Sequence, residues 1–218
     1  MKRIVLFMVS LVAMLCAHDA CAQRFIDLGY AKQIYRSPQG VGLIPILEDM
    51  NYNGASVAFR YEMLIGKAPD SPFTMQVGAK YDFHHAADKE VNAKHTEHYV
   101  SLPILFNYYI RNRASRKIMY LFAGPSITLD LSSKYRQQEK KQPAVVKDML
   151  DSYGYTNIDV MAGLGVGFVL NPKYDLRLSY NFGLTNRRGM TDGPFHTTVT
   201  RLMRLHTDLL NIGLVYKL

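Results

Sequence analysis

Apolar and polar residues alternate along most of this chain, and the alternation recurs in segment after segment. From Val100 to Ile110 every second residue is apolar. The pattern is cleaner from Leu176 to Leu184, where the residues in between are polar or glycine. Because successive side chains of a β-strand point to opposite faces, each segment predicts a strand with one apolar and one polar face.

Eight such segments follow the first 22 residues. We expect strands at residues 26–34, 56–65, 73–83, 100–110, 118–131, 158–170, 176–184 and 210–218. The connections between them are alternately short and long, and a strand that crosses a membrane needs about ten residues. We therefore predict an all-β fold: an eight-stranded antiparallel transmembrane up-and-down β-barrel with short periplasmic turns and long outer loops.

Two segments depart from the alternation. Gly124-Pro125 blurs the phase of the fifth strand, which predicts a bulge or bend there. Residues 143–153 predict a short helix in an outer loop, because a proline begins the segment, Gly154 follows it and its apolar residues gather on one side.

The first 22 residues have the pattern of a cleaved signal peptide. Lys2 and Arg3 precede an apolar core, and Ala20-Cys21-Ala22 provides small residues for cleavage. We expect cleavage near Ala22, which leaves residues 23–218 as one outer-membrane β-barrel domain. Both cysteines of the chain lie in the leader, so the mature chain is expected to have no thiol for a disulfide or a metal.

The formal net charge of +8 narrows the range of partners. An exported protein rarely meets nucleic acid, so the expected counter-charge is that of anionic outer-membrane lipids, including lipopolysaccharide. The structural alternative is a soluble lipocalin-like ligand-binding barrel with its apolar face turned inward. Charges on the polar face and aromatic residues near strand ends favour the membrane form. These aromatic residues are Tyr30, Tyr61, Tyr81, Tyr108, Phe168 and Tyr216.

The polar face of the predicted strands carries charges of both signs. The expected lumen charge network comprises Arg60, Glu62, Lys80, Asp82, Asp159 and Arg177. The interior of an eight-stranded barrel is just wide enough for its own side chains, and buried charges must be paired. A glycine stripe at positions 163, 165 and 167 also indicates a filled interior. We therefore expect a closed plug, with a narrow gated pore or a proton path as the alternative.

Histidines gather near the predicted outer side of the barrel. His84, His85, His95 and His98 lie in or beside the second outer loop and are the candidates for a surface metal or haem site, because imidazole is a common metal ligand. Their spacing matches no tight metal signature, so we expect no cofactor.

A rim-active lipid-modifying enzyme that uses His84, Ser132 and His206 is another alternative. No catalytic motif accompanies these residues, and we therefore expect no catalytic residues.

Four segments together resemble the PorT-like outer-membrane β-barrel family of Bacteroidetes. They are Leu102–Tyr109, Tyr120–Pro125, Gly163–Gly167 and Tyr180–Asn186. The resemblance covers nearly the whole mature chain and implies a barrel in the cell envelope, with a role that is structural or partner-binding. It also implies an accessory role in type IX secretion as one option, but it implies no functional residue.

The long first loop departs from that family pattern. Leu43, Ile44, Ile46 and Leu47 make it too apolar for a freely solvated loop. These residues either fold over the barrel mouth or form a docking surface for another envelope or secretion-system protein.

Replacing Leu43, Ile44, Ile46 and Leu47 together with serine distinguishes the two roles of the first loop. If the loop is a docking site, the variant inserts and resists heat like the wild type but loses its cross-linked partners, because a few apolar anchors dominate interface energy. If the loop caps the barrel mouth, heat resistance falls and the partners remain. Unchanged heat resistance together with unchanged partners would contradict both roles.

Overall fold

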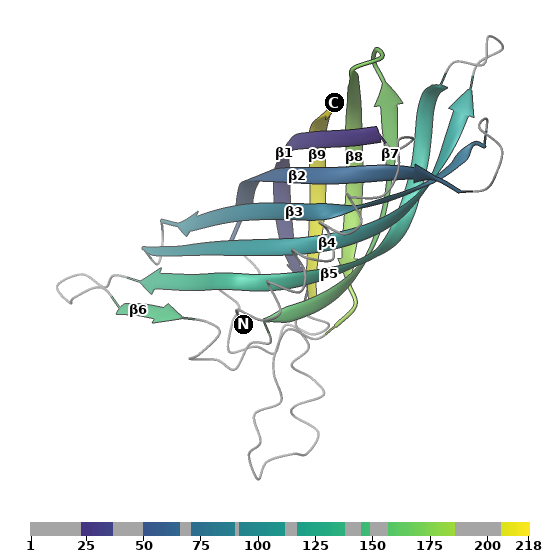
Figure 1. Ribbon diagram of the computed structural model, residues 1–218. Coiled ribbons are helices and arrows are strands. Elements are labelled where there is room, and N and C mark those ends of the chain that lie inside the picture. Colours follow the sequence, from purple (N-terminus) through teal and green to yellow (C-terminus); the bar gives the residue numbers. More distant parts are fainter. Residues whose placement is uncertain are drawn as a thin grey trace.

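The computed structural model describes residues 23–36, 50–65, 71–89, 92–111, 117–137, 145–148, 157–185 and 206–218. Eight long strands in these ranges form a ring (Figure 1). They are β1 (Gln23–Arg36), β2 (Tyr52–Leu64), β3 (Phe73–Asp88), β4 (Ala93–Arg111), β5 (Lys117–Gln137), β7 (Ile158–Val169), β8 (Tyr174–Gly183) and β9 (His206–Lys217). A short strand, β6 (Val145–Asp148), pairs with the far end of β5.

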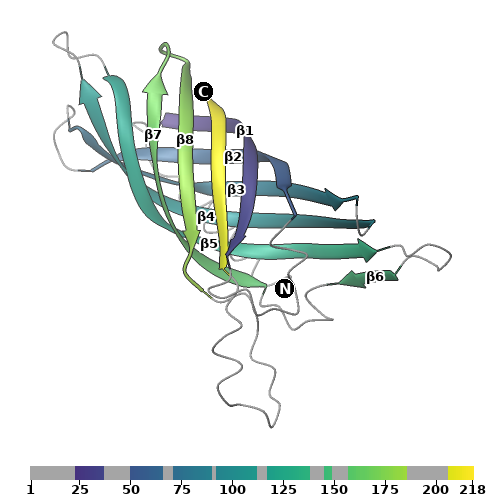
Figure 2. The ribbon, with the colours of Figure 1, turned by 180° about the vertical axis from the view of Figure 1, so that it is seen from behind.

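Antiparallel pairing joins every strand of the ring to both of its neighbours. Successive strands pair from β1 through to β5, then β5 pairs with β7, β7 with β8 and β8 with β9. The ring closes because β1 also pairs with β9, from Phe25 opposite Lys217 to Arg36 opposite His206. Figure 2 shows this closure from behind, with β7, β8, β9 and β1 side by side. The predicted eight-stranded antiparallel barrel is therefore confirmed. Within the described ranges, no helix is long and apolar enough to cross a membrane.

The two faces of the wall are divided as the alternation predicts. The outer surface carries exposed apolar side chains such as Leu28, Phe106 and Leu178, whereas the buried positions are largely polar or aromatic. Of the aromatic residues expected near strand ends, Tyr30, Tyr81, Tyr108 and Phe168 are exposed, and Tyr216 is half-buried against Tyr174. Tyr61 is the exception, because its side chain is buried.

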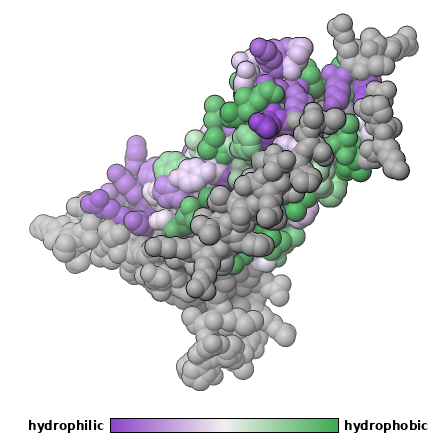
Figure 3. Space-filling model, in the orientation of Figure 1, coloured by the Kyte–Doolittle hydropathy of each residue, from purple (hydrophilic) through white to green (hydrophobic). Residues whose placement is uncertain are grey.

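The two ends of the barrel differ. We call the end where β2, β4 and β7 finish and β3, β5 and β8 begin the turn end, and the opposite end the loop end. At the loop end β3, β4 and β5 continue beyond the other described strands (Figure 1). Figure 3 shows an apolar band over the middle of the wall and hydrophilic residues over the free ends of β3 and β4.

Three local expectations are wrong. The connection between β3 and β4 is a tight hairpin rather than a long loop, because both strands continue to Asp88 and Ala93, and Asn92 takes the positive φ of 47° that asparagine tolerates in turns. Residues 145–148 form the strand β6, not a helix. The β4–β5 register shifts at two other places, where Leu131 is the extra residue opposite His98 and Tyr99 and between Ile110 and Arg111, whereas across Gly124-Pro125 the pairing with β4 is interrupted without a shift of register.

Neighbouring residues of β8 test which face meets the hydrocarbon. Leu178 is exposed on the outer surface, and Ser179 faces the lumen. We expect Leu178→Arg to cost about 2–4 kcal/mol near mid-depth, because a cation on the lipid face loses its hydration. Ser179→Ala removes one hydroxyl and is the matched control. The measurement is the fraction that folds in lipid vesicles, followed by its unheated mobility in gel electrophoresis. A larger loss for Ser179→Ala would invert the assignment of the two faces.

Candidate functional site

The lumen collects most of the buried polar side chains, because the inward positions of the strands are their polar positions. Three ion pairs lie in it, each within one strand or between two neighbouring strands. Arg60 Nη2 lies 2.7 Å from Asp27 Oδ2, and Lys80 Nζ lies 2.7 Å from Asp82 Oδ1. Nearer the turn end, Lys217 Nζ lies 2.6 Å from Asp175 Oδ1. Each pair couples a buried carboxylate to a cation, which is the condition for tolerating charge inside a narrow barrel.

Glu62 is held by neutral donors rather than by a cation. Tyr109 Oη donates to both of its carboxylate oxygens at 3.0 and 2.9 Å. Gln76 Nε2 donates at 2.6 Å and Asn107 Nδ2 at 3.3 Å. Gln76 also accepts a hydrogen bond of 2.9 Å from Arg177 Nη1, so one amide links the acid to the arginine.

Arg177 lies flat against an aromatic layer that the glycine stripe makes possible. Its guanidinium carbon lies 3.6 Å from the centroid of the Phe122 ring, a cation–π contact. A Cβ at Gly165 would lie 2.3 Å from Phe122, and one at Gly167 would lie 2.0 Å from Tyr120. Only glycine at these positions leaves room for the two rings inside the barrel.

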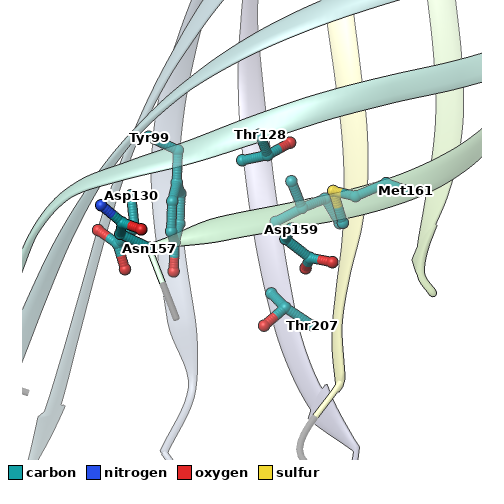
Figure 4. A pocket seen from close by; sticks show the side chains of 8 residues that line it. Tyr99, Thr128, Asp130, Asn157, Asp159, Met161 and Thr207 are labelled. Carbon is teal, nitrogen blue, oxygen red and sulfur yellow. The ribbon is translucent and has the colours of Figure 1, made fainter. Parts of the chain in front are cut away.

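Asp159 lies apart from the other five residues of the expected charge network. It lines a small cavity at the loop end together with Tyr99, Asp130, Asn157 and Thr207 (Figure 4). The cavity volume is about 10 Å³, which holds one water at most. Thr185 Oγ1 donates to the Asp159 carboxylate, so this acid has a local role at the mouth of the barrel.

The structure divides the four candidate histidines between the two faces. His84 and His95 are buried in the lumen, whereas His85 and His98 stand on the outer face, where each contacts a neighbouring strand. Among the described residues, no three histidine, cysteine or acidic side chains are arranged to hold a metal ion. The four candidate histidines are therefore not brought together as one group in the described part of the chain.

The candidate rim dyad of His84 and Ser132 is not assembled either. His84 points into the lumen, and Ser132 follows the bulge on the outward side, next to inward-facing Ser133. His206 begins β9 opposite Arg36, on the other side of the ring. The apolar first-loop residues, like the leader, lie outside the described residues.

A buried polar cluster at the loop end was missed by the sequence analysis. Ser133 Oγ lies 2.9 Å from His95 Nε2 and donates a 3.0 Å hydrogen bond to Glu97 Oε1, while Tyr52 Oη lies 2.7 Å from His95 Nδ1. Tyr35 Oη also donates to Glu97.

This cluster resembles a serine–histidine pair, but its serine, histidine and glutamate are at most 3% exposed. Ser133 donates its only proton to Glu97, not to the histidine, because an ionised carboxylate can only accept. A nucleophile needs its base as the acceptor, so this hydrogen-bonding pattern differs from that of an activated serine.

Comparisons with known proteins identify the fold. A family model described as outer membrane protein beta-barrel domain matches residues 48–187. No curated protein matches the chain.

Several solved structures match over nearly their whole length. Ail, the attachment invasion locus protein of Yersinia pestis, solved with the heparin analogue sucrose octasulfate, is 13% identical over 90% of this chain and 99% of that chain, with a TM-score of 0.51. Neisserial surface protein A is 12% identical over 90% and 99%, with a TM-score of 0.47. A major outer membrane protein of Thermus thermophilus is 13% identical over 89% and 99%, with a TM-score of 0.48. At 13% identity the likeness to Ail shows the fold alone.

The Asp27–Arg60 pair allows a test of charge compensation in the lumen. Arg60→Met leaves Asp27 buried without its cation, and we expect a loss of about 3–5 kcal/mol in the free energy of unfolding. Combining it with Asp27→Leu removes both charges, so the double variant is expected to recover much of that loss. Urea titration of the barrel in detergent micelles measures both variants. A double variant less stable than Arg60→Met would contradict this account.

Proposed function

Because this chain belongs to the outer membrane protein β-barrel domain family, we propose that it is a non-enzymatic membrane-embedded protein that binds an anionic partner at the outer surface of the cell. The partner that fits best is the phosphate-bearing head group of an outer-leaflet lipid such as lipopolysaccharide.

One cross-strand pair carries this proposal. Lys94 of β4 lies directly opposite Arg136 of β5, and both side chains are exposed. Among the described residues, neither has an ion pair or a side-chain hydrogen bond. Like charges opposite each other destabilise a sheet. Proteins typically tolerate such an unfavourable pair where it serves a function. We call this pair the basic row.

The basic row lies just outside the apolar band. Phe73 and Phe83 are exposed aromatic residues ten positions apart in β3, the length of one membrane crossing. His98 packs on Phe83 with ring centroids 5.1 Å apart. Lys94 precedes His98 by four residues in β4 and is therefore closer to the loop end. With the usual strand tilt of about 40°, Lys94 stands about 10 Å above this aromatic level. This is the depth of lipid head groups, where each cation near an anionic surface contributes about 1 kcal/mol.

The lumen supports a binding role over a transport role. Ion pairs, the Glu62 hydrogen bonds and the rings of Tyr120 and Phe122 occupy its cross-section. The buried Ser133 and His95 give a substrate no exposed reacting group. These observations support a plugged barrel rather than a pore or a rim-active enzyme.

A second candidate partner is another envelope protein, such as a component of type IX secretion. The PorT-like resemblance and the apolar residues of the first loop favour it, and the serine substitutions described above test it. This partner and the anionic ligand do not exclude each other, because the two proposals rest on different residues.

Neutralising the basic row tests the proposed function. We expect Lys94→Gln with Arg136→Gln to weaken binding of purified lipopolysaccharide about thirtyfold, since two cations at about 1 kcal/mol each are lost. Sucrose octasulfate serves as a soluble polyanion probe. Arg24→Gln with Lys173→Gln is the matched control, because it removes two exposed cations from the turn end. Heat resistance of the first variant should stay equal or rise, because a repulsion is removed. Equal affinities for the two double variants would refute the proposal.

A further inference from the structure

The middle of the lumen contains a cavity that is surrounded by cations. Its volume is about 40 Å³, room for a small ion or a few water molecules. Arg60, Lys80 and Arg177 line it from three different strands, and Asp27 is the one acidic residue in its lining. Ser56, Ser179 and Asn211 add polar groups to the wall.

Four buried hydrogen-bond donors of the residues that line it have no acceptor in the described part of the chain. They are Nε and Nη1 of Arg60, Nη2 of Arg177 and Nδ2 of Asn211. All three side chains are more than nine-tenths buried. Leaving one charged donor unsatisfied in the interior is costly, and here the three side chains that carry these four donors all line one cavity. The missing acceptor therefore belongs inside the cavity.

The charges around the cavity do not balance. Asp27 compensates Arg60, and Asp82 compensates Lys80 from beside the cavity. Arg177 has no carboxylate within ion-pair distance in the described part of the chain. Its contacts are the amide oxygen of Gln76 and the faces of Tyr120 and Phe122, and Glu62 lies beyond that amide. Counted over Arg60, Lys80, Arg177, Asp27 and Asp82, without the more distant Glu62, the groups at the cavity have an excess of one positive charge.

We propose that this central cavity is a binding site for a small monovalent anion, held between Arg60, Arg177 and Asn211. A halide ion satisfies the observations that a water molecule does not. It accepts hydrogen bonds only, as all four unpartnered groups require, and its charge neutralises the excess of one. The cavity volume excludes large or multiply charged anions such as sulfated sugars, so this site is distinct from the basic row.

Chloride supplies the test in solution. Heat resistance of the folded barrel is measured in sodium chloride and in sodium gluconate at equal ionic strength, because gluconate is too large for the cavity. We expect the transition temperature to rise by a few degrees with chloride and to saturate, since a ligand that binds only the folded state stabilises it. Arg177→Gln should abolish this chloride response, and Lys173→Gln, an exposed lysine of the turn end, should retain it. A response that persists in Arg177→Gln, or equal stability in the two salts, would overturn the proposal.

A second measurement needs no variant. Crystals of the wild-type protein grown in sodium bromide should show an anomalous scattering peak between the guanidinium groups of Arg60 and Arg177. A central cavity without such a peak would reject the site, whether or not Arg177→Gln folds.

Discussion

Closure of the hydrogen-bonded ring is the constraint on which the rest of this structure depends. A membrane has no water to satisfy a free strand edge, so β1 must pair with β9 across nearly the whole length of the chain. Eight strands in a closed ring leave an interior only as wide as a few side chains. The narrow lumen then determines which residues fit inside. Aromatic rings pack against glycines, cations pair with carboxylates, and side-chain amides bridge charged groups.

The interior of this barrel is therefore largely polar and its outer surface apolar, the reverse of a soluble domain. In a soluble domain most interior contacts are between apolar side chains and have no fixed direction, whereas here many interior contacts are directed hydrogen bonds or ion pairs. Glu62 with its neutral donors and Arg177 on the Phe122 ring illustrate two ways to hold a charge without a direct counter-charge. Such contacts fix the orientation of strands across the lumen, which the outer apolar surface alone does not do.

The alternation of residues predicts the barrel, the number of long strands and the two faces of the wall, because side-chain direction depends only on position within a strand. It does not predict the register between strands. The cluster of Ser133, His95 and Glu97 depends on that register, which shifts at Leu131 just before Ser133. The sequence predicts a loop where β3 and β4 form a hairpin, for a different reason. Outside the membrane a strand needs no apolar face, so the alternation of apolar and polar residues ends before the strands do. A signal was nonetheless present, since His84 and Ala86 alternate with outward residues, as do His95 and Glu97. The lumen charges were predicted as a set, but their pairing, and the isolation of Asp159, required coordinates.

The extension of β3, β4 and β5 gives the described part of the barrel a direction within the plane of the membrane. On one side of the loop end the paired strands β3, β4 and β5 project further from the middle of the barrel. On the opposite side the described strands β8 and β9 end closer to the middle (Figure 1). A protein that binds this projecting side contacts the barrel at one position around its circumference. A contact made through this side would therefore fix the rotation of the barrel about its own axis, while the other described strands keep their exposed apolar side chains toward the lipid.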